Sequence, residues 1–287
     1  FGFGLSYSEF KTEFVSIDKS DDGFTFKCKV TNIGSVPSAY APQVYVEKPC
    51  GVLGNPYREL AAFNKTKVLA AGESEELTMF ISMYDLASYD ESGKAGYKSA
   101  YVIEKGEYGF SLGDNVRDAV KVTAWTNEEN TLYRQHRQTA APRADFDIIS
   151  AVKENGEYKA VKVKAFKKEY DLKKIILEGL PKDIPQTGDK GYKLIDVKNG
   201  KVSMEDFVAQ LSLKELEAIS RGDYTMGSKL GALGNAGAFA GVLPSLRAKG
   251  VPACITTDGP SGIILSACCS LMPIGTLLAR TFDVDLV

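Results

Sequence analysis

Short runs of alternating apolar and polar residues extend from Glu13 to about Trp125. Such alternation is typical of β-strands with one buried and one solvated face. In the run from residue 24 to residue 30 it places four apolar side chains on one face: Phe24, Phe26, Cys28 and Val30. Runs at 43–46 and 77–81 continue the pattern, with turn-rich stretches between them. Several short strands spaced by turns predict a β-sandwich over residues 1–125.

The pattern weakens between residues 126 and 200, where charged residues are frequent. The lysine-rich run 159–165 still alternates with apolar residues, which predicts an edge hairpin or a solvated strand. Leu180 to Pro185 holds two prolines and closes this segment. We therefore interpret 126–200 as a connector that includes a hairpin.

Helical spacing begins after Ser203 and again after Ser212. Each serine precedes an acidic residue by three positions, Asp206 and Glu215 respectively, which is the pattern of a capped helix start. Two short consecutive helices are therefore expected.

A glycine-rich passage at 227–241 follows these helices. It is either a loop packed against them or a loop that faces a substrate. The apolar run Val251–Thr257 then leads into Asp258, Gly259 and Pro260, which predicts a buried strand that ends in a tight turn.

Composition limits the classes of partner. The 287 residues are 44% hydrophobic and 25% charged, which is enough for two ordinary cores. A net charge of −2 offers no electrostatic footprint for nucleic acid or an anionic membrane. The longest apolar stretch, Leu230–Leu243, is shorter than the roughly 20 residues of a membrane span. We expect neither a nucleic-acid nor a membrane partner.

Cysteine and histidine usage argues against a metal centre. The five cysteines form neither an even framework nor a Cys-x-x-Cys pattern, so they are expected to be reduced and mostly buried. His136 is the only histidine, so no His-dependent metal cluster or Ser-His-Asp triad can form within this sequence. We expect no metal and no cofactor, and an ordinary surface or packing role for His136.

The predicted sandwich shows no obvious chemistry. Its aromatic residues recur at strand spacing and are expected to fill the core rather than form a ligand platform. Arg58 and Glu59 are adjacent on a predicted strand and should point to opposite faces, where salt bridges at the surface or between domains are expected.

Two strings resemble glycoside hydrolase family 3. Phe1–Tyr7 resembles the signature that opens the family's fibronectin type III-like domain, and Thr256–Gly262 resembles the sugar-binding Asp-Gly-Pro loop of its (β/α)8 barrel. Segments 58–63 and 68–74 resemble further stretches of the same fibronectin type III-like domain. The barrel comes first in most of the family, whereas one branch of bacterial β-glucosidases has the inverted order.

The resemblance implies a multidomain fragment of that inverted branch. It would comprise an all-β fibronectin type III-like sandwich at 1–125, the connector at 126–200, and the N-terminal part of an α/β (TIM) barrel at 201–287, which would be incomplete. A barrel with one strand of eight cannot close, so we expect an exposed apolar face.

Asp258 is the one candidate site residue. On local grounds Asp-Gly-Pro is a common turn. The resemblance instead implies substrate binding, because the matching Asp in the family holds the non-reducing glucose before the scissile bond. A carboxylate there can accept hydrogen bonds from two sugar hydroxyls. Ile264 stands where the family usually has Arg, which removes a bidentate donor, and Ile274 replaces a residue that is usually small or polar.

The resemblance implies no catalytic residue in this chain. Retaining glycosidases need two carboxyl groups about 5–5.5 Å apart. The family's nucleophile lies in a Ser-Asp-Trp stretch of a later barrel strand, whereas the one tryptophan here, Trp125, falls in the predicted sandwich. The family's acid/base Glu comes from a separate (α/β)6 domain. The segment Thr281–Val287 resembles the first helix of the family's barrel.

The function implied for the parent protein is hydrolysis of terminal non-reducing β-D-glucosyl residues with retention. Its partners would be a β-glucoside or oligosaccharide, the missing (α/β)6 domain and the remainder of the barrel. The alternative is a non-catalytic module of fibronectin type III-like fold that contacts carbohydrate or protein. Reduced cysteines and the lack of a visible signal sequence favour the cytoplasm, and a secreted or periplasmic location stays open.

Overall fold

The computed structural model describes residues 2–138, 141–168, 171–223, 226–259 and 261–287. The chain forms two compact units. The first comprises Phe1–Tyr170 together with Ala279–Val287, and the second comprises Asp171–Leu278. The second unit is thus an insertion whose two ends both continue into the first.

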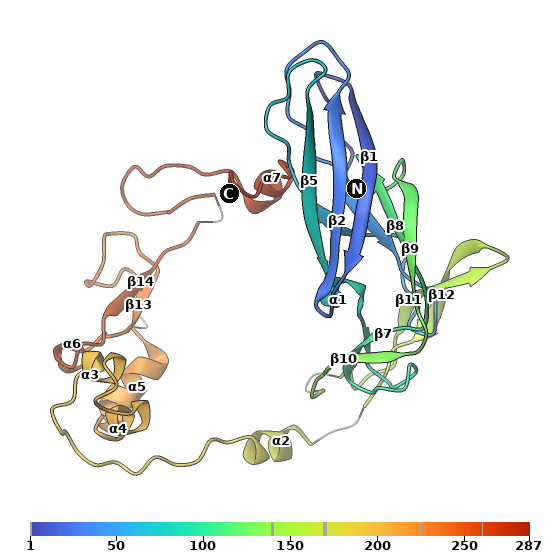
Figure 1. Cartoon of the computed structure of the whole chain (residues 1–287). Coiled ribbons are helices and arrows are strands. Elements are labelled where there is room, and N and C mark those ends of the chain that lie inside the picture. Colours follow the sequence, from blue (N-terminus) through green and yellow to red (C-terminus); the bar gives the residue numbers. More distant parts are fainter. Residues whose placement is uncertain (1, 139–140, 169–170, 224–225, 260) are drawn as a thin grey trace. The chain divides into compact units, whose positions relative to one another are not determined.

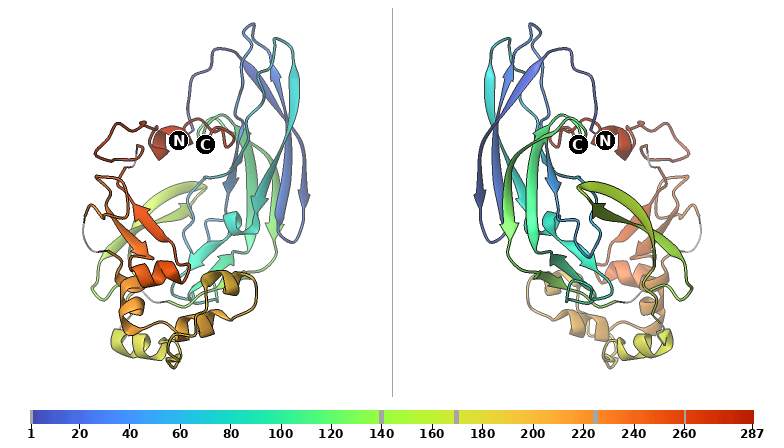
Figure 2. Two further views of the ribbon diagram at one scale, coloured as in Figure 1. Left: turned by 90° about the vertical axis from the view of Figure 1, so that its left-hand side faces the viewer. Right: turned by 90° about the vertical axis from the view of Figure 1, so that its right-hand side faces the viewer.

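Two antiparallel sheets form the body of the first unit (Figures 1 and 2). One has the strand order β1-β2-β5 and the other the order β4-β3-β8-β9. The strands are β1 (Phe10–Lys19), β2 (Gly23–Asn32), β3 (Gln43–Glu47), β4 (Glu59–Phe63), β5 (Ser74–Ser82), β8 (Gly106–Gly113) and β9 (Val120–Asn127). The predicted sandwich is confirmed.

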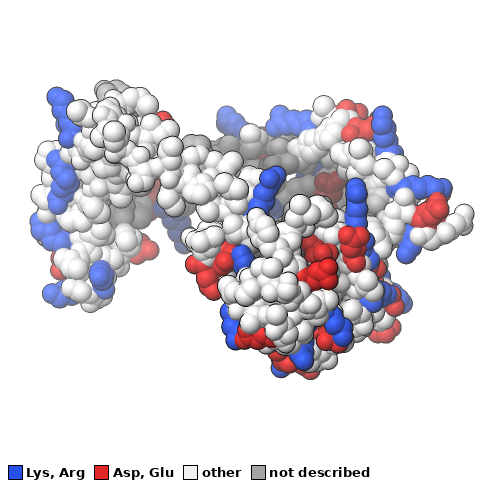
Figure 3. Space-filling view, turned by 90° about the horizontal axis from the view of Figure 1, so that it is seen from above, with Lys and Arg blue, Asp and Glu red and all other residues white. Residues whose placement is uncertain are grey.

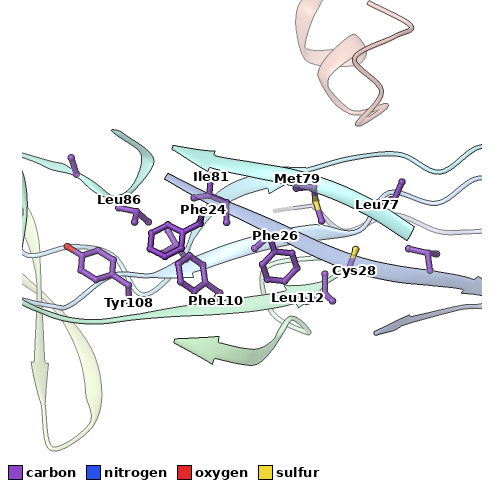
Figure 4. Close-up of a cluster of buried hydrophobic side chains, with 14 of the residues drawn as sticks. Phe24, Phe26, Cys28, Leu77, Met79, Ile81, Leu86, Tyr108, Phe110 and Leu112 are labelled. Carbon is purple, nitrogen blue, oxygen red and sulfur yellow. The ribbon is translucent and has the colours of Figure 1, made fainter. Parts of the chain in front are cut away.

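The core lies between these sheets (Figure 4). The alternation of β2 is realised as expected, because Phe24, Phe26, Cys28 and Val30 are all buried. The ring of Phe24 lies 5.3 Å from that of Phe110 on β8, which joins the two layers. Each fully buried side chain of this size contributes about 1.5–3 kcal/mol, so this row of residues is a principal source of the sandwich's stability.

A smaller sheet with the order β10-β7-β6 adjoins the sandwich. Its strands are β6 (Ser88–Asp90), β7 (Ala100–Ile103) and β10 (Thr131–Gln135), preceded by the short helix α1 (Met83–Leu86). Ser82 and Asp85 form a capping box that starts α1. Ala100 and Val102 of β7 are fully buried, so one face of this sheet is packed.

A two-stranded hairpin completes the first unit. It consists of β11 (Asp147–Glu154) and β12 (Glu157–Lys164), and the edge hairpin expected around 159–165 is confirmed. Asn155 and Gly156 both have positive φ, 51° and 87°, as a two-residue type I′ turn requires. Tyr158 of the hairpin packs against Tyr57 at 5.3 Å.

The second unit is built from short helices and one strand pair. Its helices are α2 (Leu172–Glu178), α3 (Leu194–Lys198), α4 (Met204–Ala209), α5 (Leu213–Arg221), α6 (Pro244–Ala248) and α7 (Gly275–Ala279), the last of which ends at the unit boundary. Ser203 and Ser212 accept the predicted capping hydrogen bonds from Asp206 N and Glu215 N, so both expected helix starts are confirmed. The buried apolar cluster of this unit contains Phe207, Leu211, Ala218, Leu246 and Val251.

The strand predicted within Val251–Thr257 is confirmed, but the prediction that it is buried was wrong. A strand is present there, β14 (Ala253–Thr256), but its residues are half-buried or exposed. It pairs antiparallel with β13 (Gly237–Ala240), its partner among the described residues. Parallel barrel strands are covered on both faces, and no start of a barrel is evident in the described part of this chain.

The helix expected at Thr281–Val287 was also wrong. Phe282 has a φ of +49°, a left-handed conformation that a right-handed helix does not accommodate. Its ring makes an edge contact at 5.2 Å with Phe63 of β4. Lys65 donates a hydrogen bond to the Thr281 carbonyl and pairs with Asp283 at 3.3 Å. The segment is therefore fixed by the sandwich instead of coiling.

Candidate functional site

Asp258 follows β14 directly and its side chain is exposed. The backbone holds it in place: Ile264 N donates to the Asp258 carbonyl at 2.9 Å, and Thr257 Oγ1 donates to the carbonyls of Asp258 and Ile264, both at 2.9 Å. Within the described residues its carboxylate accepts no hydrogen bond from the protein. The backbone around Asp258 is thus held by hydrogen bonds, while its carboxylate faces solvent. Pro260 lies outside the described residues.

Glycine is required twice in this loop. A Cβ at Gly259, where φ is +137°, would lie 1.6 Å from the Gly262 carbonyl oxygen. One at Gly262, where φ is +114°, would lie 2.4 Å from the Ser270 carbonyl oxygen. Since real side chains never approach backbone so closely, the turn after Asp258 depends on both residues.

The glycine-rich passage lies beside the Asp258 loop. Ser266 N donates to the Leu233 carbonyl at 2.9 Å, and Ala236 N donates to the Thr256 carbonyl at 2.8 Å. The passage is therefore a packed loop, and it contacts the candidate sugar-binding turn. The interpretation as a packed loop is thus supported, and the interpretation as a substrate-facing loop stays a prediction.

Asn235 organises that passage and was not singled out from the sequence. It is buried, and its Oδ1 accepts hydrogen bonds from Ser228 N and Gly237 N, both at 2.9 Å. Its Nδ2 donates to the carbonyls of Ser228 and Ala232 at 2.8 and 2.7 Å. These four bonds use both N–H donors and both oxygen lone pairs of the side-chain amide, so Asn235 closes the loop as a backbone turn would. A lone Asn within a run of glycines was the only signal.

A buried ion cluster supports the same unit. Lys249 Nζ lies 2.9 Å from Glu215 Oε1 and 2.9 Å from Asp189 Oδ2, and both Lys249 and Glu215 are buried. Burial by itself raises the pKa of Glu215, but hydrogen bonds from Lys249, Ser212 and Ser245 outweigh it and lower the pKa to about 2. The hydrogen bond to Glu215, and then that to Asp189, raises the pKa of Lys249. The cluster joins the start of α5 and the end of α6 to the loop that carries Asp189.

Arg58 and Glu59 make two separate ion pairs in the sandwich unit. Arg58 pairs with Glu47 at 2.8 Å, and Glu59 pairs with Lys48 at 2.6 Å. The prediction of salt bridges is confirmed, but both pairs lie within the sandwich unit, and the side chains of Arg58 and Lys48 are buried instead of lying at the surface. Their partners lie on and beside β3, so these pairs fasten β4 to its neighbour rather than form a site.

The prediction that the cysteines are reduced and mostly buried is confirmed only in part. All five are free thiols, as predicted. Only Cys28 is buried, however, while Cys268 and Cys269 are exposed, so the expectation of mostly buried thiols was wrong. The exposed pair lies in a loop segment of the second unit that offers no apolar cover, unlike the strand position of Cys28 in the sandwich core.

Many apolar side chains of the second unit are exposed. Those around β14 and the Asp258 loop include Leu233, Ile255, Ile263, Ile264, Leu271, Met272, Ile274 and Leu277. Soluble proteins rarely leave so many neighbouring large apolar residues uncovered, so this region has the character of an interface.

Two features are absent from the described residues: a metal-binding cluster and a helix that could span a membrane. No group of three or more His, Cys, Asp and Glu side chains there could hold a metal ion. Among the same residues, no helix is both long and apolar enough to cross a membrane. Lys and Arg side chains are interspersed with Asp and Glu on the face seen in Figure 3.

Residues 40–116 match the family model of the fibronectin type III-like domain. The predicted domain type is thereby confirmed for the centre of the sandwich. The whole chain is also similar to two curated relatives. It is 38% identical over 291 residues to a β-glucosidase of Ruminococcus albus, and 32% identical over 326 residues to β-glucosidase A of Butyrivibrio fibrisolvens. It covers 30% of the first relative and 38% of the second, so the chain spans about a third of their length.

A solved structure agrees with these relatives. A β-glucosidase from Paenibacillus barengoltzii superposes on 100% of this chain with a TM-score of 0.91 and 40% sequence identity, which accounts for 32% of that chain. The fibronectin type III-like domain and the second unit therefore occur together in a region similar to part of known β-glucosidases.

Proposed function

We propose that this chain is part of a β-glucosidase of glycoside hydrolase family 3 with the inverted domain order. The protein would hydrolyse terminal non-reducing β-D-glucosyl residues. The observation that carries this proposal is the similarity over the entire chain, at 38–40% identity, to proteins named β-glucosidase. Similarity of the sandwich alone would be weaker support, because that domain carries no identified chemistry.

In this proposal Asp258 binds the sugar. Its carboxylate is exposed, and its backbone is held because the Asp258 carbonyl accepts hydrogen bonds from Ile264 N and from the Thr257 hydroxyl. A carboxylate so placed can accept hydrogen bonds from two adjacent sugar hydroxyls, at about 1.5–3 kcal/mol for each charged bond. Ile264 supplies no donor, so sugar binding here depends on Asp258 more than it would beside an Arg.

The two catalytic carboxyl groups would lie outside these 287 residues. The reaction would proceed with retention through a glycosyl-enzyme intermediate, with a nucleophile on a later barrel strand and an acid/base from the (α/β)6 domain. β14 would be the first barrel strand, and the exposed apolar residues around it would pack against the remainder of the barrel. We propose a cytoplasmic location, which the five free thiols support, with a secreted or periplasmic location as the alternative.

The test is an Asp258→Asn variant of the natural gene product that contains this chain. Losing charged hydrogen bonds to two hydroxyls should lower kcat/KM for 4-nitrophenyl β-D-glucoside about 100-fold or more, since each tenfold corresponds to about 1.4 kcal/mol. Asp183→Asn, at an exposed position of the connector, is the matched control and should leave kcat/KM unchanged. Equal activity of the two variants would contradict the role of Asp258.

A further inference from the structure

An exposed cluster of aromatic rings lies on the small sheet of the first unit. We call it the tyrosine platform and define it as Tyr84, Tyr89, Tyr101 and Tyr133. Tyr84, Tyr89 and Tyr133 are 46%, 40% and 36% exposed, whereas the core tyrosines Tyr45 and Tyr108 are fully buried. The expectation that the aromatic residues of the sandwich would fill the core is therefore wrong for Tyr84 and Tyr89, whereas Tyr101 packs partly against the core.

Strand pairing places the centre of the platform on one face. Tyr89 of β6 stands directly opposite Tyr101 of β7, and Tyr101 stands directly opposite Arg134 of β10. Directly opposite residues project to the same side of a sheet, so a row crosses all three strands. The rings of Tyr89 and Tyr101 meet edge to face with centroids 5.4 Å apart.

Two further rings extend the row. Tyr84 of α1 lies 5.1 Å from Tyr101, and its hydroxyl donates to the Tyr101 hydroxyl at 3.3 Å. Tyr133 lies 6.0 Å from Tyr84, and the register shift between Leu132 and Arg134 accounts for its position on this side. The imidazole of His136 adds an edge contact to Tyr101 at 5.4 Å.

Buried apolar residues support the rings from below. Ala100 and Val102 of β7, and Leu86 of α1, are fully buried beneath the platform's strands and helix. Because every ring already contacts another ring, ligand binding would immobilise few side chains that are not already ordered. A preordered, solvent-facing set of large rings is a binding surface rather than core left over from packing.

The chemistry of the platform selects a neutral, amphipathic ligand. Each tyrosine offers an apolar ring face and a hydroxyl that donates and accepts hydrogen bonds. A β-linked glucose unit has the complementary form, with axial C–H groups on both faces and hydroxyls around its rim. The charged side chains on these elements are Arg134, Asp85 and Asp90, and such a mixture gives no strong positive field for a polyanion or an anionic membrane.

We propose that the tyrosine platform binds a β-linked gluco-oligosaccharide, as a second carbohydrate site separate from the Asp258 loop. The choice of β-linked glucose rests on the proposed function, whereas the platform itself rests on its geometry. Such a site would hold the glycan without acting on it, because the neighbouring carboxylates are engaged in the protein: Asp85 caps α1, and Asp90 accepts hydrogen bonds from the backbone of residues 93–95.

The experiment is titration of the 287-residue chain with cellotetraose, followed by calorimetry and by NMR shifts of the tyrosine rings. Tyr89→Ala and Tyr133→Ala should each weaken binding about tenfold, the effect of about 1.4 kcal/mol from one stacking ring. Tyr7→Ala is the matched control, since Tyr7 is 93% exposed and outside the platform, and it should bind as the unaltered chain does. Near-ultraviolet circular dichroism would establish that each variant remains folded.

The remaining outcomes overturn the proposal. In the first, the chain does not bind cellotetraose. In the second, Tyr89→Ala, Tyr133→Ala and Tyr7→Ala weaken binding equally, and in the third, binding is unchanged in Tyr89→Ala and Tyr133→Ala. If only Asp258→Asn lost cellotetraose binding, the sugar would bind at the Asp258 loop. That result would contradict the platform proposal and support the proposed function. Preferential binding of a proline-rich peptide, the other ligand that stacks on tyrosine, would identify a protein-docking surface instead.

Discussion

The two units of this chain are stabilised in different ways. The sandwich buries a continuous apolar core between two sheets, with Phe24, Phe26 and Phe110 at its centre. In Asp171–Leu278 the buried apolar cluster is small, and a charged cluster of Lys249, Glu215 and Asp189 stands beside it. The sandwich thus depends on non-directional burial, and the second unit depends on the geometry of a few polar contacts.

This contrast bears on function. The unit with the larger core carries no identified chemistry beyond its tyrosine platform, while the candidate sugar-binding loop belongs to the unit with exposed apolar residues. Loops that bind ligands are often drawn from the less stable parts of a structure. Three perturbations test the contrast, in order of expected effect.

The largest effect is expected for Phe26→Ala. Removing this fully buried ring should lower the free energy of unfolding of the sandwich by roughly 4 kcal/mol, because a cavity remains in the core. Hydrogen exchange should show lost protection in β2 and β5 and unchanged protection in α5. Phe80→Ala, on the exposed face of β5, is the control and should change little. Equal losses in both units would show that they unfold together.

A somewhat smaller effect is expected for Lys249→Ala. The substitution leaves Glu215 buried without its cation and should destabilise the second unit by roughly 3 kcal/mol. Exchange protection should fall in α5 and α6 and persist in the sandwich strands. Lys214→Ala, at an exposed position of α5, serves as the control. Retained protection in α5 would mean that the ion cluster is dispensable.

The smallest effect is expected from acid. The pKa of Glu215 is lowered from 4.5 to about 2, so its contribution to stability is present above its unfolded pKa and is lost as pH falls from about 4.5 towards 2. Exchange protection of α5, corrected for intrinsic rate, should fall across that window before that of β2. In Glu215→Gln this difference between the units should shrink. Simultaneous loss in both units of the unaltered chain would contradict the assignment.

The sequence predicted those features that local patterns encode. Alternation identified β2 and β5, and the serines at 203 and 212 identified two helix starts, since each pattern lies within a few residues. The bond between Lys249 and Glu215 joins residues 34 positions apart, and no periodicity reports such a contact. Alternation also does not say whether a second sheet covers a face, which is why Tyr89 was expected in the core.

The sequence predicted the candidate site residue, Asp258, but not the strand pairing and loop contacts around it. Asp258 came from a resemblance to a family, and its position after a strand agrees with that prediction. The strand before Asp258 pairs antiparallel with β13, and the described residues contain no parallel neighbour for it. Asn235, which shapes the adjoining loop, acts through four backbone contacts that depend on the folded loop.

The most direct test of the proposed function is an activity measurement on the purified 287-residue chain with 4-nitrophenyl β-D-glucoside, beside the natural gene product. If this chain carries the sugar-binding aspartate without the catalytic carboxyl pair, the natural product turns the substrate over and the 287-residue chain does not. Turnover by the pure chain at a comparable rate would contradict the account, because both catalytic carboxyl groups would then have to lie within these residues.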